Sequence, residues 1–142
     1  MLLKHHPLMR ISIDLDGFKI VNDEYGHMTG DDLLNSVAIC LRKVFRNTDL
    51  VARMGGDEFV VYMKDISNRT DVMAKALEAC TALKQLPIAN KYEHCISASM
   101  GIALSPLHGD TFEELYRKSD KALYHAKSIG KDRCVFYDSD MD

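Results

Sequence analysis

The sequence contains no tryptophan, only 3 prolines among 142 residues, and no run of about 18 apolar residues. Without such a run, a membrane-spanning helix of ordinary length is excluded. The N-terminal heptapeptide Met-Leu-Leu-Lys-His-His-Pro also lacks the apolar stretch of a signal peptide. We therefore expect a cytoplasmic domain without direct membrane contact from this segment, which is compatible with a membrane anchor elsewhere in a longer parent protein.

Cysteine pairs and excess charge are also lacking. The four cysteines lie far apart and form no Cys-x-x-Cys motif, so zinc-site and thioredoxin-type motifs are excluded and reduced thiols are expected. The chain has 18 Lys and Arg against 21 Asp and Glu, for a net charge of −3. A balance of this kind gives no reason to expect a nucleic-acid partner, and any phosphate-binding patch must be local.

Hydrophobic periodicity predicts one α+β domain over residues 8–138, with tails at 1–7 and 139–142. Helices are mixed with a β-hairpin instead of alternating strictly with strands, so we expect a mostly antiparallel central sheet covered by helices. Strands are expected over residues 8–13, 50–53, 58–63, 95–104 and 135–137, and helices over 18–25, 31–47, 72–86 and 111–129.

Helix ends are predicted from capping residues. Gly26 and Gly30 are expected to bracket a turn, after which Asp31 or Asp32 caps the second helix. The last helix is expected to break near residues 119–120.

Acidic residues stand where strands are expected to end. Asp14 and Asp16 follow the first strand, and Asp57 and Glu58 lie at the tip of the hairpin. If strand and hairpin are neighbours, these carboxylates converge, and their repulsion favours a bound Mg²⁺ or Mn²⁺. Such a site suits phosphoryl or nucleotidyl transfer. For each acid taken singly, the alternative is a polar residue that merely flanks an exposed turn.

The segment Arg-Met-Gly-Gly-Asp-Glu-Phe at residues 53–59 resembles the signature of GGDEF domains, the bacterial diguanylate cyclases. The resemblance covers residues 8–137 and implies a fold similar to the nucleotide cyclases and the polymerase palm. Further motifs in the family's order and spacing are Asp14-Leu15-Asp16-Gly17-Phe18-Lys19, Asn22-Asp23, Gly26-His27, Gly30-Asp31-Asp32-Leu33-Leu34, Ser99-Met100-Gly101-Ile102, His108-Gly109, Ser119-Asp120-Lys121-Ala122-Leu123-Tyr124-His125-Ala126-Lys127 and Gly130-Lys131-Asp132-Arg133.

The resemblance implies condensation of two GTP into cyclic di-GMP, with release of pyrophosphate, by a homodimer in which each domain holds one GTP. The implied ligands of Mg²⁺ or Mn²⁺ are Asp14, Asp57 and the Leu15 carbonyl. The implied catalytic residues are Gly55, Gly56, Asp57 and Glu58. The implied substrate-binding residues are Asn22 and Asp31 for guanine and Lys19, Lys127 and Lys131 for the triphosphate.

Structural roles are the alternative for several of these residues. Asn22 can cap a turn, Asp31 can cap a helix, and Lys127 and Lys131 can be solvated lysines near the C-terminal end of a helix. Lys131 also stands where the family usually has arginine, which preserves the charge but loses the bidentate fork.

The tetrapeptide Arg46-Asn47-Thr48-Asp49 resembles the family's inhibitory site, in which Arg46 and Asp49 bind the product. The family's Asp-x-Leu-Thr-Gly-Leu-x-Asn-Arg segment does not precede Leu8, so the chain is expected to lack an N-terminal helix. The alternative function is therefore a non-catalytic GGDEF module that senses cyclic di-GMP or GTP within a larger signalling protein.

Overall fold

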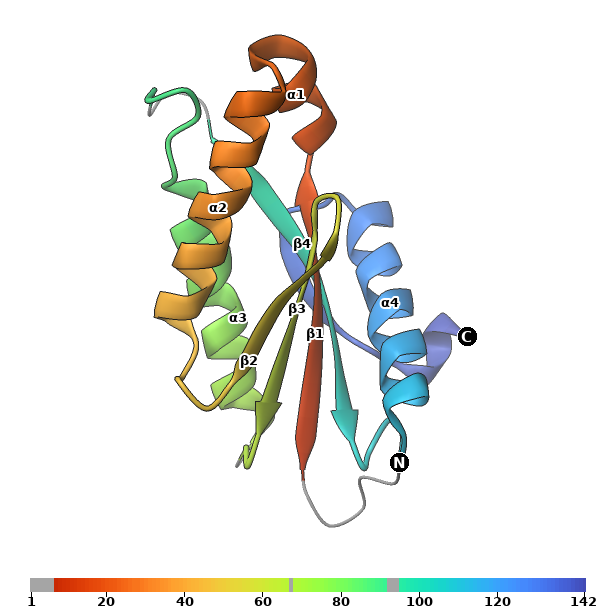
Figure 1. Cartoon of the computed structure of the whole chain (residues 1–142). Coiled ribbons are helices and arrows are strands. Elements are labelled where there is room, and N and C mark those ends of the chain that lie inside the picture. Colours follow the sequence, from red (N-terminus) through yellow and green to blue (C-terminus); the bar gives the residue numbers. More distant parts are fainter. Residues whose placement is uncertain (1–6, 67, 92–94) are drawn as a thin grey trace.

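A computed structural model of the chain describes residues 7–66, 68–91 and 95–142, so all but Pro7 of the expected N-terminal tail lies outside the described residues. The sheet has the strand order β2-β3-β1-β4-β5 (Figure 1). The strands are β1 (Leu8–Asp16), β2 (Leu50–Gly55), β3 (Glu58–Lys64), β4 (Ser97–Ser105) and β5 (Arg133–Phe136). The helices are α1 (Phe18–Tyr25), α2 (His27–Val44), α3 (Arg69–Lys84) and α4 (Phe112–Ser128), followed by the 3₁₀ helix Ser139–Met141.

The central strand β1 pairs antiparallel with β3 on one side and with β4 on the other. The hairpin partner β2 is antiparallel to β3, and only β5, at the far edge, runs parallel to its neighbour β4. The prediction of an α+β fold with a mostly antiparallel sheet is confirmed. None of the helices in the described ranges is long and apolar enough to cross a membrane.

The two faces of β1 differ in chemistry because its side chains alternate across the sheet. Met9, Ile11, Ile13 and Leu15 are at most 2% exposed and belong to the main core, which α2 and α3 cover. The opposite face carries Arg10, Ser12, Asp14 and Asp16 and lies against α4 (Figure 1). Polar residues that are needed for chemistry are therefore placed on one face without weakening the apolar core on the other.

Buried polar side chains on the α4 face satisfy one another. The Arg10 guanidinium, 3% exposed, donates to the hydroxyls of Tyr62 at 2.9 Å and Ser119 at 2.8 Å, and also to Ser12. It lies over the Tyr116 ring, 4.7 Å from the centroid. This cluster fixes α4 on the sheet below the site.

The predicted start of the second helix and the predicted break in the last one are wrong, whereas the end of α2 and the bounds of α3 differ from the prediction by two or three residues. The second helix begins at His27, so Gly30, Asp31 and Asp32 lie inside it, and its N-cap is Gly26, which provides no side-chain cap. The last helix is continuous from Phe112 to Ser128. Ser119 does not break it, because its hydroxyl bonds to the Tyr116 carbonyl and to the Arg10 cluster.

Candidate functional site

The C-terminal end of β1 meets the tip of the β2–β3 hairpin. Asp14 lies opposite Glu58 of β3 and, on the other side, opposite Ser99 of β4. The Leu15 amide donates to the Asp57 carbonyl at 3.3 Å. The predicted convergence of acidic residues from strand and hairpin is therefore present in the structure.

Asp14 is the buried carboxylate of this group, at 7% exposed. Its Oδ2 atom forms an ion pair with Lys127 of α4, whereas its Oδ1 atom is buried and lacks a hydrogen-bond partner among the described residues. A buried polar atom without a partner is costly, so a further cation or donor at Oδ1 would be stabilising. Burial lowers the pKa of Lys127, and the nearby Lys131 lowers it further.

The unpartnered Oδ1 atom of Asp14 has the chemistry that a divalent cation prefers. Mg²⁺ prefers oxygen ligands and commonly uses one or two carboxylates together with substrate phosphates. Within the described ranges, no group of three or more His, Cys, Asp and Glu side chains is arranged to hold a metal ion. An ion held here would meet Asp14 Oδ1 beside the hydrogen-bonded backbone of Leu15 and Asp57, and its other positions would fall to the substrate.

Asp16 has a structural role that the sequence did not reveal. Its carboxylate accepts hydrogen bonds from the hydroxyls of Ser97 and Ser99, each at 2.7 Å, and from the Asp132 amide at 3.0 Å. It therefore holds the turn after α4 against the sheet. The polar residues at every second position from Arg10 to Asp16 were the available signal, because alternate residues of a strand share a face.

The glycine pair at the hairpin tip leaves the backbone open. Gly55 and Gly56 have φ of 141° and 52°, which favour glycine, and the hairpin register shifts between Arg53 and Gly55. The Arg53 side chain donates to the Gly56 carbonyl at 2.8 Å and braces the turn. A Cβ atom built on either glycine would meet nothing within 4 Å, so a ligand can approach this backbone closely.

Asn22 and Asp31 lie near the contact of α1 with α2. Gly30 packs so closely on the Asn22 amide group that a Cβ at Gly30 would overlap it. Asp31 is exposed on α2, one residue further along, so the alternative of Asp31 as a helix cap is wrong. Lys19, on α1, is also exposed. The structure thus brings a side-chain amide and a carboxylate to one helix corner.

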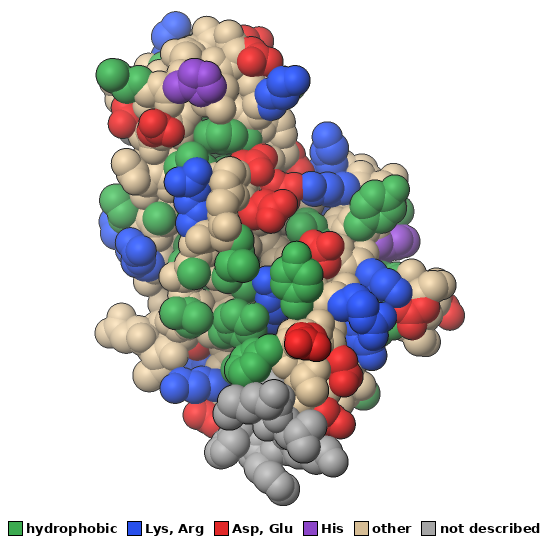
Figure 2. All heavy atoms as spheres, turned by 45° about the vertical axis from the view of Figure 1, so that its right-hand side comes forward, with side chains coloured by type: hydrophobic (Ala, Val, Ile, Leu, Met, Phe, Trp, Pro, Cys, Tyr) green, Lys and Arg blue, Asp and Glu red, His purple; other side chains and the backbone are tan. Residues whose placement is uncertain are grey.

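Two of the predicted triphosphate-binding lysines, Lys127 and Lys131, lie at the C-terminal end of α4 and in the turn after it. Lys127 lies in the last turn of the helix, and the Lys131 amide donates back to the Ala126 carbonyl at 2.9 Å. Gly130 and Lys131 have positive φ values of 132° and 62°, so the chain turns sharply here. At this level Figure 2 shows acidic and basic side chains next to each other. The ion pair with Asp14 contradicts the alternative of Lys127 as a merely solvated lysine.

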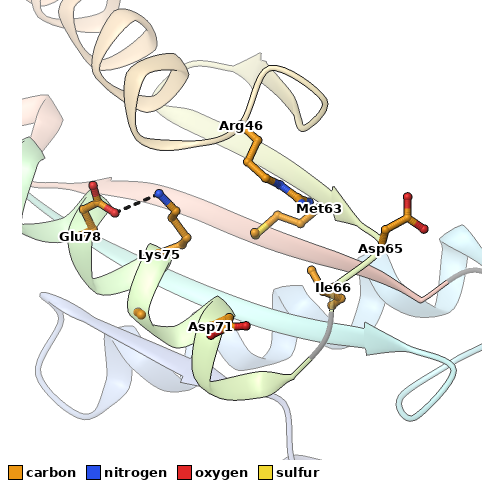
Figure 3. Close-up of a pocket in the computed structure, with 8 residues that line it drawn as sticks. Arg46, Met63, Asp65, Ile66, Asp71, Lys75 and Glu78 are labelled. Carbon is orange, nitrogen blue, oxygen red and sulfur yellow. Dashed lines mark hydrogen bonds and ion pairs between the residues drawn. The ribbon is translucent and has the colours of Figure 1, made fainter.

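Arg46 and Asp49 form a second polar group at the opposite end of α2. The Arg46 guanidinium donates to the Asp49 carboxylate, with an Nη2–Oδ1 distance of 2.7 Å, and to the Lys64 carbonyl at 2.7 Å. The hydrogen bond to Asp49 is the main reason that the pKa of Arg46 is raised. The side chain is nevertheless exposed and borders a hollow of about 360 Å³ between β3 and α3 (Figure 3).

Charges of both signs line that hollow. Lys75 of α3 donates to Glu78 at 3.3 Å and to the Val44 carbonyl at 3.0 Å. Asp65 and Asp71 contribute two further carboxylates (Figure 3). A ligand at Arg46 would meet its Nη1 group, because Asp49 accepts from Nε and Nη2 and the Lys64 carbonyl also accepts from Nη2.

The sequence matches the family model described as "Diguanylate cyclase, GGDEF domain" over residues 2–133. It is 43% identical over 92% of its length to the bifunctional diguanylate cyclase/cyclic di-GMP phosphodiesterase MucR of Pseudomonas aeruginosa. It is 35% identical over 95% of its length to the diguanylate cyclase DosC of Escherichia coli. The chain spans 19% and 29% of these two relatives, respectively.

Solved structures with a similar fold include the GGDEF domain of YfiN (TpbB) from Pseudomonas aeruginosa, with a TM-score of 0.87, 34% identity, and coverage of 94% of this chain and 83% of that one. The active GGEEF domain of a diguanylate cyclase from Vibrio cholerae has a TM-score of 0.85, 30% identity, and coverage of 94% and 84%. The GGDEF domain of DgcB from Caulobacter crescentus in complex with cyclic di-GMP has a TM-score of 0.83, 26% identity, and coverage of 92% and 78%.

Proposed function

The chain belongs to the GGDEF domain family, and from this membership we propose that it is a diguanylate cyclase domain, which condenses two GTP into cyclic di-GMP and two pyrophosphates. The observation that carries the proposal is Asp14, a buried carboxylate with one unpartnered oxygen, beside the open glycine turn and Lys127. The relatives of the chain include proteins named as diguanylate cyclases. A carboxylate that can hold a cation, a lysine beside it and an accessible backbone are the groups that nucleotidyl transfer requires for binding a nucleoside triphosphate.

The proposed site divides substrate binding among the helix corner, the end of α4 and the hairpin tip. Asn22 and Asp31 of the helix corner hydrogen-bond the guanine edge, because an amide and a carboxylate together supply the acceptors and the donor that guanine needs. Lys19, Lys127 and Lys131 hold the triphosphate, and the amides of Gly55 and Gly56 approach it without side-chain obstruction.

The reaction joins the 3′-oxygen of one GTP to the α-phosphorus of another, and pyrophosphate leaves. Glu58 is the proposed acceptor of the 3′-hydroxyl proton, as it lies opposite Asp14 on the neighbouring strand. A bound Mg²⁺ or Mn²⁺ at Asp14, Asp57 and the Leu15 carbonyl would neutralise phosphate charge. One domain holds one GTP, so two copies of the chain must face each other to bring both substrates together.

The test is incubation of the chain with GTP and Mg²⁺, both alone and fused to a homodimeric coiled coil that enforces pairing. Cyclic di-GMP and pyrophosphate in a 1:2 ratio, measured by chromatography, support the proposal. If neither cyclic di-GMP nor pyrophosphate accumulates even in the enforced dimer, while cyclic di-GMP or GTP still binds, the chain is a sensor module instead.

Gly30→Ala is predicted to weaken GTP binding by about tenfold. The added methyl overlaps the Asn22 amide, which must move away from the guanine position, and loss of one or two hydrogen bonds to a base costs on this order. Calorimetric titration with a non-hydrolysable GTP analogue measures the change. Asn35→Ala, an exposed change on the same helix, is the control, and equal affinity of Gly30→Ala and the control would contradict the assignment.

We also propose that cyclic di-GMP inhibits the enzyme by binding at Arg46 and Asp49. The Nη1 group of Arg46, which is not among the donors to Asp49 and Lys64, can donate charge-assisted hydrogen bonds to a phosphate or a guanine edge. The solved complex of the DgcB GGDEF domain with cyclic di-GMP is consistent with product binding to this fold.

Arg46→Ala is predicted to weaken cyclic di-GMP binding at least about 30-fold, because the charge-assisted hydrogen bonds from the guanidinium to the ligand are lost. Calorimetry with cyclic di-GMP measures the effect, and Arg42→Ala, which changes an exposed arginine in the last turn of α2, should bind normally. Unchanged product affinity in Arg46→Ala, with its circular dichroism intact, would overturn the inhibitory site.

A further inference from the structure

Two thiols lie side by side where α3 packs against β5 on the core side of the sheet. Cys80 of α3 and Cys134 of β5 are 54 positions apart in the chain, yet their Sγ atoms are 3.2 Å apart. Both are free thiols; Cys80 is buried and Cys134 is partly buried. The two belong to elements that pack together, α3 and β5, so the proximity follows from the fold.

We propose that Cys80 and Cys134 form a reversible disulfide when the protein meets a hydroperoxide. A disulfide needs sulfur atoms about 2 Å apart, so each Sγ has to move by only about half an ångström or a little more. Rotation about χ1 of the two side chains moves the Sγ atoms on this scale.

The surroundings of the pair give the two sulfurs different roles. The hydrogen bond with Cys134 lowers the pKa of Cys80, against the opposing effects of burial and of Asp132 and Asp16, and Lys84 lowers it further. The same hydrogen bond, with burial, raises the pKa of Cys134. Cys80 is therefore the attacking thiolate and Cys134 the resolving thiol, as thiolate character controls reactivity.

The oxidation balances as two steps. The Cys80 thiolate attacks one oxygen of the peroxide, the O–O bond breaks, and with one proton Cys80 sulfenic acid and water (or an alcohol) form. The Cys134 sulfur then attacks the sulfenic sulfur, the S–O bond breaks, and a second water leaves with the Cys134 proton. Overall, two thiols lose two electrons and two protons to one hydroperoxide.

The bond would join α3 to the strand that follows the turn at Lys131 and Asp132. In the thiol form, the Lys84–Asp132 ion pair, at 2.5 Å, already links the same two segments. A disulfide that closes a chain loop of this length restricts the unfolded state, so the melting temperature is expected to rise by about 5 to 10 °C on oxidation.

The experiment treats the full chain with a small excess of hydrogen peroxide, alkylates the remaining thiols, and maps the peptides by mass spectrometry. The expected result is one intramolecular Cys80–Cys134 cross-link, a mass loss of about 2 Da, and recovery of both thiols with dithiothreitol. Cys40 and Cys95 should remain reduced and should therefore be alkylated, since burial raises the pKa of Cys40 and Cys95 lies outside the pair.

Variants separate this pair from accidental oxidation. Cys134→Ser should trap Cys80 as sulfenic acid, which a dimedone probe labels, whereas Cys40→Ser should cross-link as the natural sequence does. If Cys134→Ser does not fold, peptide mapping of the unaltered chain still decides the matter. Alkylation of both Cys80 and Cys134 after peroxide treatment, or a cross-link to Cys95 instead, would refute the proposal. Nucleotide turnover is not measured, so failure here leaves the cyclase proposal untouched.

Discussion

Asp14→Asn should lower the rate of cyclic di-GMP synthesis by about 1000-fold, the scale seen when one preorganised electrostatic group is removed from a reaction centre. The amide has nearly the shape of the carboxylate but carries no charge. It can neither balance the Lys127 ammonium nor attract a divalent cation to the buried Oδ1 position. The loss should therefore appear in turnover measured at saturating GTP and Mg²⁺ in the enforced dimer.

The same variant should fold almost as well as the natural sequence. Lys127 is 37% exposed at its side chain, so water can solvate its ammonium when the partner charge is gone. Glu113→Gln is the matched control, because it removes one exposed carboxylate from α4, far along the helix from Lys127. If Asp14→Asn kept more than a tenth of the control's activity, the assignment of Asp14 to the reaction centre would be wrong.

The meeting of β1 with the hairpin was predictable because each part is signalled locally. An apolar strand that ends in Asp14-Leu15-Asp16 and a glycine turn followed by Asp57-Glu58 are short-range patterns. Pairing of β1 with β3 then brings the acids together without further information. The confirmed bounds of α1, Phe18–Tyr25, are local in the same sense.

The start of α2 was not predictable from capping residues, because a tertiary contact decides it. Asp31 has the chemistry of an N-cap, but the helix continues back to His27, where Gly26 provides the tight turn from α1. Gly30 is needed inside the helix because the Asn22 side chain occupies the space of its Cβ. Gly30, which the sequence pattern placed at a turn, is therefore a residue of the helix that allows close packing on Asn22.

The contacts between α4 and the sheet, and between the two thiols, join residues that are far apart in sequence. Arg10 reaches Ser119 across 109 positions, and Cys80 reaches Cys134 across 54. The sequence excluded a Cys-x-x-Cys motif correctly, but spacing along the chain carries no information on which helix packs beside β5. Only the three-dimensional arrangement reveals these pairs.

Gly101→Ala should destabilise the fold by about 3 kcal/mol or more, among the largest effects of any single methyl group in this chain. A Cβ at Gly101 would overlap the Ser119 carbonyl oxygen and the Leu123 amide, which are backbone atoms of α4 and cannot rotate away. The helix would have to move off β4 as a unit. Because the chain lacks tryptophan, urea unfolding followed by far-ultraviolet circular dichroism is the suitable measurement.

Gly17→Ala separates this steric effect from the general cost of replacing glycine. Gly17 has a φ of 73°, but the nearest atom to its Cβ would be 3.8 Å away, so only backbone strain of about 1 kcal/mol is expected. Equal destabilisation by the two variants would contradict the role of Gly101. If the effects differ as predicted, a helix displaced from β4 also carries Lys127 away from Asp14, so Gly101→Ala should lose cyclase activity under conditions in which it is still folded. The site would then require the close packing of α4 on Gly101, although Gly101 touches no substrate, because this packing sets the distance between the Asp14 carboxylate and the Lys127 ammonium.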